Sequence, residues 1–447
     1  MRILKQLISV VGVFFLSGCC WNAYTNKAMD QTMHRVSEEA THATFDIKDK
    51  RGNPDVLLAM ALSGGGSRAA YFSASAMLKL QDVFNDIDIL KEIDVVSSVS
   101  GGSLPAAYYC ISKDSKEDKV RSNRYWNEGV VKKLMSINYQ GKWIENLFWP
   151  YNIFRYWFTA YDRSDIMAQT FEDNLFDVSP LGSELKFRDL NPERPYLIIN
   201  ATDGTENIGK EKHFGELFTF TKEDFSNKLN SDINSYSVAR AVMASAAFPG
   251  AFNYMTLMDY RDPEVKDERY LHLFDGGNSD NLGLKSIKRI LFATKDRYKH
   301  YIVILIDSYK EKRGIDRNNC DPRSLFSYVV DLNFMDTFDS LLDANRKNLL
   351  DQFKSHTFNM GDNKTYTIGN LTFWHVTFQD IDPGIKDDIG TEEKSFKEAL
   401  NMIPTSFSID AKDTKRIDRA VDLLINEDNV ILKQIRDLLL GKHGRYR

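Results

Sequence analysis

Two near-continuous apolar runs end in glycine clusters and then continue as helix-like segments. The first, residues 55–63, reads DVLLAMALS and is followed by three glycines; the second, residues 93–99, reads IDVVSSV and is followed by Ser-Gly-Gly. Strands covered by helices on both faces read as continuous apolar runs, because neither face meets water. The chain is therefore predicted to have an α/β fold.

Three further apolar runs extend this pattern, at residues 195–203, 269–277 and 301–309. Helix-like stretches separate the runs, which favours helices packed on both faces of a mostly parallel sheet. After the last run the pattern is weaker. Residues 371–381 could add an edge strand, and apolar residues at helical spacing after Asp410 predict a late helix.

Composition is that of an ordinary globular protein with ample material for a buried core. The chain has 447 residues, of which 43% are hydrophobic, and a formal net charge of −5. Lysine and arginine are scattered rather than grouped, so no nucleic-acid partner is expected.

The N-terminus has the pattern of an export signal. Arg2 and Lys5 lead into an apolar run that is too short to cross a bilayer as a permanent helix. The sequence LSGC at residues 16–19 then resembles the lipobox of bacterial lipoproteins. The resemblance implies cleavage before Cys19 and acylation of that cysteine, and several acyl chains would anchor the protein stably. An ordinary signal peptide and an uncleaved anchor are the alternatives.

These patterns divide the chain into four predicted regions. They are a lipoprotein signal peptide at 1–18, a polar tether at 19–50, a core domain at 51–310 and a C-terminal extension at 311–447 packed on the same domain. Because Cys20 rather than aspartate follows the acylated position, the outer membrane of a bacterial envelope is the expected location.

The segment DVVSSVSGGSLPAAYY at residues 94–109 raises the question of which serine could be a nucleophile. A nucleophile on a sharp strand-to-helix turn needs small residues two positions before and two after it. Only Ser100 has them, in Ser98 and Gly102; every other serine here has valine or proline in one of these places. A glycine-rich turn without chemistry is the alternative.

The loop LSGGGSRAA at residues 62–70 places three glycines at the start of a helix. Glycine lets the main chain approach a ligand closely, and free N–H groups at a helix N-terminus favour an anion. The loop lacks the Gly-Lys-Ser/Thr of a phosphate loop and the last glycine of a dinucleotide-binding pattern. An oxyanion hole fits better, with N–H donors around Gly65 and Gly66 and another from Gly101. Arg68 either holds the loop in shape or merely begins the helix.

A serine nucleophile needs a base, and histidine is the usual one. Asp307 followed by His356 or His375 would keep the order of serine, acid and histidine found in α/β-hydrolases. Neither histidine lies in a marked loop, however. His375 and His272 lie within apolar runs and are interpreted as half-buried strand residues.

Asp275 is the other candidate base. It ends an apolar strand and precedes Gly276 and Gly277, whose small size leaves its carboxylate accessible. Asp203 precedes Gly204 in a rival arrangement, and either pair could be a turn-forming Asp-Gly. Spacing alone does not choose between the two aspartates.

Four blocks occur in the order found in patatin-like phospholipases: GGGSR at 64–68, SVSGG at 98–102, SAAFPGAF at 245–252 and DGG at 275–277. Over roughly residues 56–285 the chain resembles this family. The resemblance implies a three-layer α/β/α sandwich and lipid acyl hydrolysis by a Ser–Asp dyad without histidine or cofactor. A membrane lipid would then be the substrate.

Carried over to this sequence, the resemblance makes Ser100 the nucleophile, Asp275 its base and the loop Gly64–Gly66 the oxyanion hole. The implied supporting positions are Arg68, Gly102, Gly276 and Gly277. Asp203 falls outside the dyad motif. Two positions depart from the family pattern: Ser98 replaces the first glycine of the elbow, and Ala69 stands where many members have glycine. No metal-ligand spacing is present, so no metal is expected.

An aromatic insertion at about residues 121–165 contains four of the six tryptophans. Trp and Tyr favour surfaces where one side is apolar and the other wet, so a lid or a membrane-facing surface is one interpretation. Packing between helices is the other. Cys110 and Cys320 are expected to be unpaired, with Cys110 buried as a small hydrophobic residue.

Overall fold

The computed structural model describes residues 24–30, 45, 47, 52–114, 124–176, 184–207, 212–261, 269–311, 332–359, 365–390 and 394–441. The predicted signal peptide, the lipidation site Cys19 and Cys320 lie outside these residues. Cys110 is buried, and its thiol donates to Pro195 O at 3.7 Å. Among the described helices, none is both long and apolar enough to span a bilayer.

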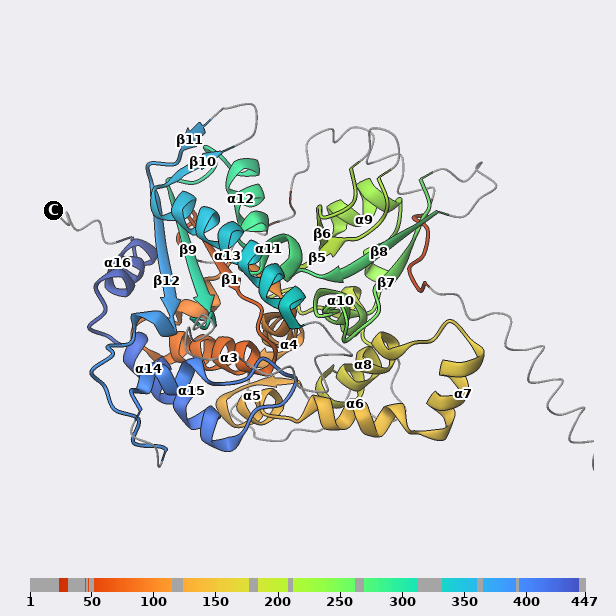
Figure 1. Cartoon of the computed structure of the whole chain (residues 1–447). Helices are drawn as coiled ribbons and strands as arrows, with labels where there is room; N and C mark the ends of the chain where they lie inside the picture. The colour runs from red at the N-terminus through yellow and green to blue at the C-terminus, as the bar shows by residue number, and fades with distance from the viewer. Residues whose placement is uncertain are drawn as a thin grey trace, which may run out of the picture.

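A central eight-stranded sheet organises the molecule (Figure 1). Its strands follow the order β12-β9-β1-β2-β5-β8-β7, and β6 also pairs with β5. The strands are β1 (Val56–Leu62), β2 (Val95–Val99), β5 (Tyr196–Asp203), β6 (Leu217–Phe220), β7 (Met255–Asp259), β8 (Arg269–Asp275), β9 (His300–Asp307) and β12 (Leu371–Thr377). Two small sheets pair β3 (Lys113–Asp114) with β4 (Tyr125–Trp126) and β10 (Thr357–Asn359) with β11 (Thr365–Thr367).

Helices lie between and around these strands. They are α3 (Gly66–Asp82), α4 (Ser103–Ile111), α5 (Glu128–Met135), α6 (Tyr139–Leu147), α7 (Pro150–Phe158), α8 (Arg163–Phe171), α9 (Lys222–Leu229), α10 (Val238–Ser245), α11 (Gly277–Asp280), α12 (Leu284–Ala293), α13 (Leu332–Lys354), α14 (Phe396–Asn401), α15 (Ala411–Leu424) and α16 (Val430–Leu439). The late helix expected after Asp410 is α15.

Two hydrophobic cores, one on each face of the sheet, make the fold a three-layer α/β/α sandwich, as predicted. In β1 the alternate residues Leu58 and Met60 join the core beneath α3 and α4, whereas Leu57 and Ala59 join the core beneath α12 and α13. This alternation follows from the two-residue period of a strand. All seven residues of β1 are buried, which explains its continuous apolar sequence.

Strand direction changes within the sheet. The five strands β12, β9, β1, β2 and β5 are parallel to their neighbours along this path, whereas β8 is antiparallel to β5 and β7 is antiparallel to β8. In β2, Val99 pairs with Asn200 of β5, and on the other side of β5 Ala201 pairs with Asp275 of β8. Ser100, which follows β2, and Asp275, the last residue of β8, therefore lie on either side of β5 at the level of Asn200 and Ala201.

Regions distant in the sequence complete this body. β12 pairs with β9 at the sheet edge, where the sequence suggested an additional strand, and α15 packs against α3. Part of the segment expected to be a polar tether is bound to the body. There Asn26 is buried, and its side chain donates to Ser231 Oγ at 3.0 Å and to the main-chain oxygen of Met258 at 2.9 Å.

Candidate active site

Ser100 lies at a strained turn between β2 and α4. Its φ is +48°, a left-handed conformation that L-residues other than glycine rarely adopt. A Cβ on Gly101 would lie 2.0 Å from Gly66 O, and one on Gly102 would lie 2.6 Å from Ser63 O. The turn therefore needs glycine at both positions, as in a nucleophile elbow.

The block at residues 245–252 holds both sides of this site together. Ser245, the last residue of α10, accepts the N–H of Ser100 on its Oγ at 2.8 Å and donates that hydroxyl to Asn200 O at 2.5 Å. Its own carbonyl accepts the N–H of Gly276 at 3.1 Å, and Ala247 O accepts the N–H of Asp275 at 3.1 Å. A single short segment thus fixes the main chain at both Ser100 and Asp275.

Replacing Ser245 by alanine should lower kcat on a soluble ester by about 10- to 100-fold with little change in KM. The reason is that the buried N–H of Ser100 loses its acceptor, which costs about 1–3 kcal/mol of free energy in the correctly positioned nucleophile. Threonine, which keeps the hydroxyl, should restore most of the rate. Ser112→Ala is the matched control, since Ser112 is equally buried and its hydroxyl, which donates to Tyr109 O at 2.8 Å and accepts from Arg194 Nη2 at 3.4 Å, has no bond to Ser100 or Asp275. Equal effects of the two alanine variants would contradict this positioning role.

Asp275 faces Ser100 across β5. The Ser100 hydroxyl lies near enough to act on its carboxyl group as a hydrogen-bond donor, and its Oδ1 accepts the N–H of Gly277 at 2.7 Å. Burial raises the pKa of Asp275 to about 6, although these two hydrogen bonds act in the opposite direction. The sequence-predicted pair is therefore brought together, with a carboxyl group that ionises just below neutral pH.

Three main-chain N–H groups remain available beside Ser100. Within the described part of the chain, the amides of Gly65, Gly66 and Gly101 donate to no protein acceptor, whereas the amide of Gly64 donates to Asn281 O at 3.0 Å. Gly65 and Gly66 have φ of +139° and +61°, which explains why the loop is built of glycine. Of the predicted oxyanion donors, Gly64 has its N–H already occupied.

Arg68 is a structural support rather than an exposed anion ligand. Its side chain is buried, and Nη1 donates to Ile403 O at 2.8 Å. Burial lowers the pKa of Arg68 to about 10, while the charge of Asp307 opposes this change. Of the two interpretations offered by the sequence, holding the loop in shape fits these contacts.

A C-terminal segment, residues 403–407, covers the glycine loop. The sequence had not predicted that this segment borders the site. Ser406 O accepts the N–H of Ser67 at 2.7 Å, and a Cβ on Gly66 would lie 2.3 Å from the same oxygen. Phe407 O accepts the N–H of Gln140 at 3.0 Å. No motif marks this segment, because its contacts depend on how residues more than 260 positions apart pack.

Asn281 also borders the site, and the sequence did not single it out. Its side-chain Oδ1 would lie 2.2 Å from a Cβ on Gly64 and 3.0 Å from one on Gly277. It therefore sits between the glycine loop and the turn that follows Asp275. The only signal was its place in the polar run GGNSDNLGL.

The alternative acids form other contacts. His375 Nε2 lies 2.8 Å from Asp307 Oδ2, so the acid–histidine pair considered from the sequence does exist, and Arg346 bonds to the same carboxylate. Burial alone would raise the pKa of Asp307, but His375 and Arg346 hold it below its ordinary value. Asp203 accepts the N–H of Thr205 at 2.9 Å and lies 3.0 Å from His213 Nδ1. Among described residues, neither pair is hydrogen-bonded to Ser100.

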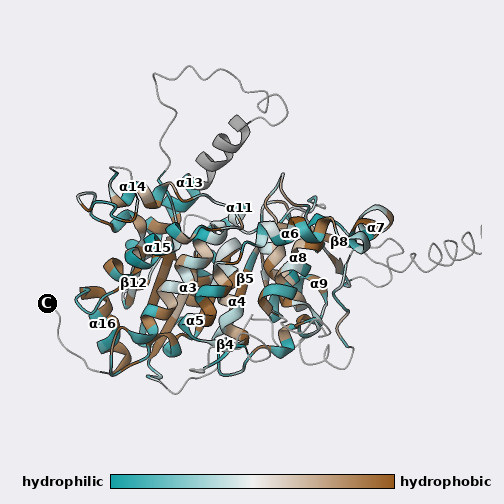
Figure 2. Ribbon diagram, turned by 90° about the horizontal axis from the view of Figure 1, so that it is seen from below, coloured by the Kyte–Doolittle hydropathy of each residue, from teal (hydrophilic) through white to brown (hydrophobic). Residues whose placement is uncertain are grey.

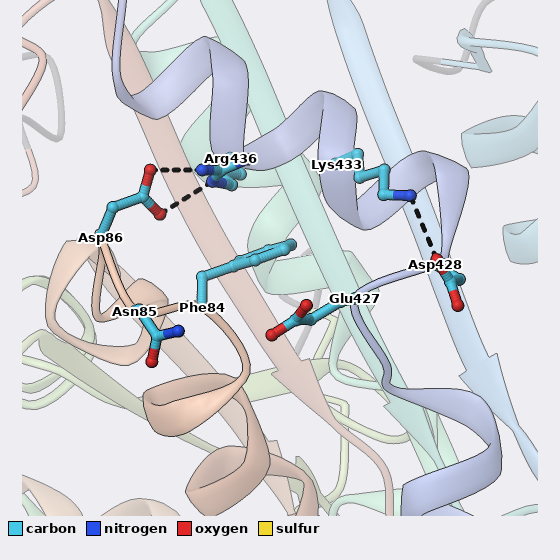
Figure 3. A pocket seen from close by; sticks show the side chains of 7 residues that line it. All are labelled: Phe84, Asn85, Asp86, Glu427, Asp428, Lys433 and Arg436. Carbon is cyan, nitrogen blue, oxygen red and sulfur yellow. Dashed lines mark hydrogen bonds and ion pairs between the residues drawn. The ribbon is translucent and has the colours of Figure 1, made fainter.

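A surface pocket of about 280 Å³ lies far from this site (Figure 3). It is lined by Phe84, Asn85, Asp86, Glu427, Asp428, Lys433 and Arg436. The 17-residue helix α3, about 25 Å long at 1.5 Å per residue, separates it from the glycine loop. Arg436 Nε donates to Asp86 Oδ1 at 2.8 Å and its guanidinium stacks on Phe84, so the pocket is a seam between α3 and α16.

A family model and two solved structures are similar to this chain. The sequence pattern described as "Patatin-like phospholipase" matches residues 60–287, just over half of the chain. A human GIVD cytosolic phospholipase A2 structure is similar at 11% identity, covering 95% of this chain and 69% of that one, with a TM-score of 0.44. VipD from Legionella pneumophila is similar at 13% identity, covering 87% and 73%, with a TM-score of 0.28. No curated protein sequence matches. The chain belongs to the patatin-like phospholipase family.

Proposed function

We propose that the protein is a lipid acyl hydrolase in which Ser100 is the nucleophile and Asp275 its base. Membership of a phospholipase family supports lipid hydrolysis in general. The observation that carries the specific proposal is that the Ser100 hydroxyl, at an elbow whose φ is +48°, lies near enough to the buried carboxyl group of Asp275 to act on it as a hydrogen-bond donor. A turn without chemistry has no need of such a pair.

In the proposed reaction, Asp275 takes the proton of the Ser100 hydroxyl as Oγ attacks the ester carbonyl carbon. The carbonyl oxygen becomes an oxyanion, which accepts hydrogen bonds from the amides of Gly65, Gly66 and Gly101. Each well-placed donor is worth roughly 3–4 kcal/mol. The carbon–oxygen bond to the alcohol then breaks, and the alcohol leaves with the proton from Asp275. Water, deprotonated by Asp275, then attacks the acyl-serine. The bond to Ser100 Oγ breaks, Ser100 takes the proton back from Asp275, and the carboxylic acid leaves.

The same proposal includes attachment to the bacterial envelope through acylated Cys19. Its support is the lipobox-like sequence at residues 16–19. An acylated N-terminus would keep the enzyme at the surface of its substrate, the phospholipid bilayer, with the outer membrane as the favoured location.

The test is the mass analysis of products from a phospholipid with two different acyl chains. The wild-type protein should release a free fatty acid and a lysophospholipid, and the identity of the acid shows which ester is cut. Release of acid only from water-soluble esters would instead indicate an esterase whose substrate is not a membrane lipid. No hydrolysis of either substrate would leave a non-catalytic envelope lipoprotein.

A further inference from the structure

The exposed surface of α7 and the two residues before it is unusually aromatic. We call this the aromatic surface; it consists of Phe148, Trp149, Tyr151, Phe154, Trp157 and Phe158. Trp157 is 74% exposed and Phe148 69%. Of the two interpretations of the aromatic insertion, packing between helices accounts for other residues, such as buried Trp126, but not for these rings.

Specific contacts hold α7 in place while leaving its rings outside. Pro150 begins the helix, and the buried side chain of Asn152 donates to Asn146 O at 2.9 Å. The guanidinium of Arg155 lies 3.5 Å from the centre of the Tyr161 ring. One narrow side of α7 thus faces the body, and the remaining sides carry the aromatic surface.

The aromatic surface lies at the end of the molecule where the N-terminal segment binds. The ring of Tyr24 lies 5.7 Å from that of Tyr270 in β8. Tyr270 also lines a pocket of about 370 Å³ together with Ala160 and Asp162, just after α7. Both Figure 1 and Figure 2 place α7 and β8 at this same end, with α16 at the other.

The distance along the chain to the proposed anchor is short. Cys19 precedes Tyr24 by five residues, so even a fully extended chain would place the acylated cysteine within about 18 Å of Tyr24. A bilayer that held the acyl chains would therefore lie close to the aromatic surface.

We infer that the aromatic surface docks into the headgroup region of the bilayer that holds the N-terminal acyl chains. Tryptophan and tyrosine are the side chains favoured at that depth, where one edge of the ring is apolar and the other wet. Residues 139–163 carry three basic and two acidic side chains, so this region meets phosphate groups without a large opposing charge. The inference rests on the proposed function for its choice of a phospholipid bilayer as the partner.

Aromatic contacts connect this end of the molecule to the candidate active site. Trp143 of α6 packs on Phe252 with ring centres 5.4 Å apart, and Phe252 packs on Phe407 at 5.9 Å. Phe407 follows Ser406, which covers the glycine loop. Docking by α7 would thus place the bilayer beside the elements that border Ser100.

Quenching of tryptophan fluorescence by brominated lipid tests docking without any need for activity. The full chain carrying Ser100→Ala is reconstituted in phosphatidylcholine vesicles with and without brominated acyl chains. We expect bromine-dependent quenching that falls by at least about half in the pair Trp149→Phe and Trp157→Phe. The matched pair Trp126→Phe and Trp374→Phe, at buried positions, should keep it. Equal quenching before and after Trp149 and Trp157 are replaced would overturn the inference.

Hydrolysis by the chain with Ser100 intact is the second readout. Trp149→Ala with Trp157→Ala should lower the rate on phospholipid vesicles by about tenfold or more and leave a short-chain soluble ester unaffected. Val430→Ser with Ile431→Ser removes exposed apolar groups from α16, at the opposite end, and should change neither rate. Equal loss on both substrates would contradict docking. If the wild type hydrolyses neither ester, the proposed function fails while the quenching result still decides the role of α7.

Discussion

Replacing Ser100 by alanine should lower the rate of ester hydrolysis by about 10⁴- to 10⁶-fold, the loss seen when the nucleophile of a serine hydrolase is removed. The same change should abolish covalent labelling by a fluorophosphonate, which forms its bond with an activated serine hydroxyl. The fold should remain, because alanine adopts a φ of +48° about as readily as serine. The main-chain N–H at position 100 is also kept and can still donate to Ser245 Oγ.

Ser98→Ala is the matched control for this experiment. Ser98 is buried two residues before Ser100, and its hydroxyl donates to Ile198 O at 3.2 Å instead of facing Asp275. This variant should be labelled and should keep activity within about tenfold of the wild type, since it loses one neutral hydrogen bond. Labelling that persists in Ser100→Ala, or that disappears in Ser98→Ala, would show that the wrong serine has been assigned.

The sequence was sufficient for the parts of the fold that depend on local pattern. β1 and β2 are continuous apolar runs because both of their faces are covered, and the glycines after them mark main-chain contacts that exclude a Cβ. β8 differs from β1 and β2. Along Arg269–Asp275, buried residues alternate with more exposed ones. That alternation is typical of an antiparallel strand with one partly exposed face, and it could have predicted the change of direction.

The remaining features of the site depend on packing over long sequence distances. Ser245 bonds to Ser100 from 145 residues away, and Arg68 reaches Ile403 across 335 residues. Such pairs leave no periodic or composition signal in one sequence. The small flanking residues singled out Ser100, and family resemblance chose Asp275 over Asp203, but their meeting depends on the pairing of Val99 with Asn200 and of Ala201 with Asp275.

Asp275→Asn should abolish most activity and also remove a specific pH dependence. An amide cannot accept the proton of Ser100, so we expect a loss of at least about 10³-fold. In the wild type only the ionised carboxylate is a base. Because the pKa of Asp275 is raised to about 6, kcat/KM on a soluble ester should fall about tenfold per pH unit below pH 6 and be level above it. Asp203→Asn is the control and should keep this profile.

The same variant should become more stable relative to the wild type as the pH rises. Between the ordinary aspartate pKa of 3.8 and the folded value of about 6, the folded wild type holds a proton that the unfolded chain has released. Its free energy of unfolding therefore falls with increasing pH across this window, by about 3 kcal/mol for two pKa units. Asparagine resembles the protonated acid at every pH, so the variant lacks this loss.

Urea denaturation of both proteins from pH 4 to pH 8 measures the effect. The difference in free energy of unfolding, variant minus wild type, should rise by about 2.4 kcal/mol between pH 4 and pH 7, since every other titrating group contributes equally to both proteins and cancels. A difference that stays constant with pH would mean that Asp275 is already ionised at pH 4 in the folded protein. If kcat/KM also began to fall only near pH 4, the two results together would contradict a raised pKa of Asp275 and its role as a base tuned to near-neutral pH.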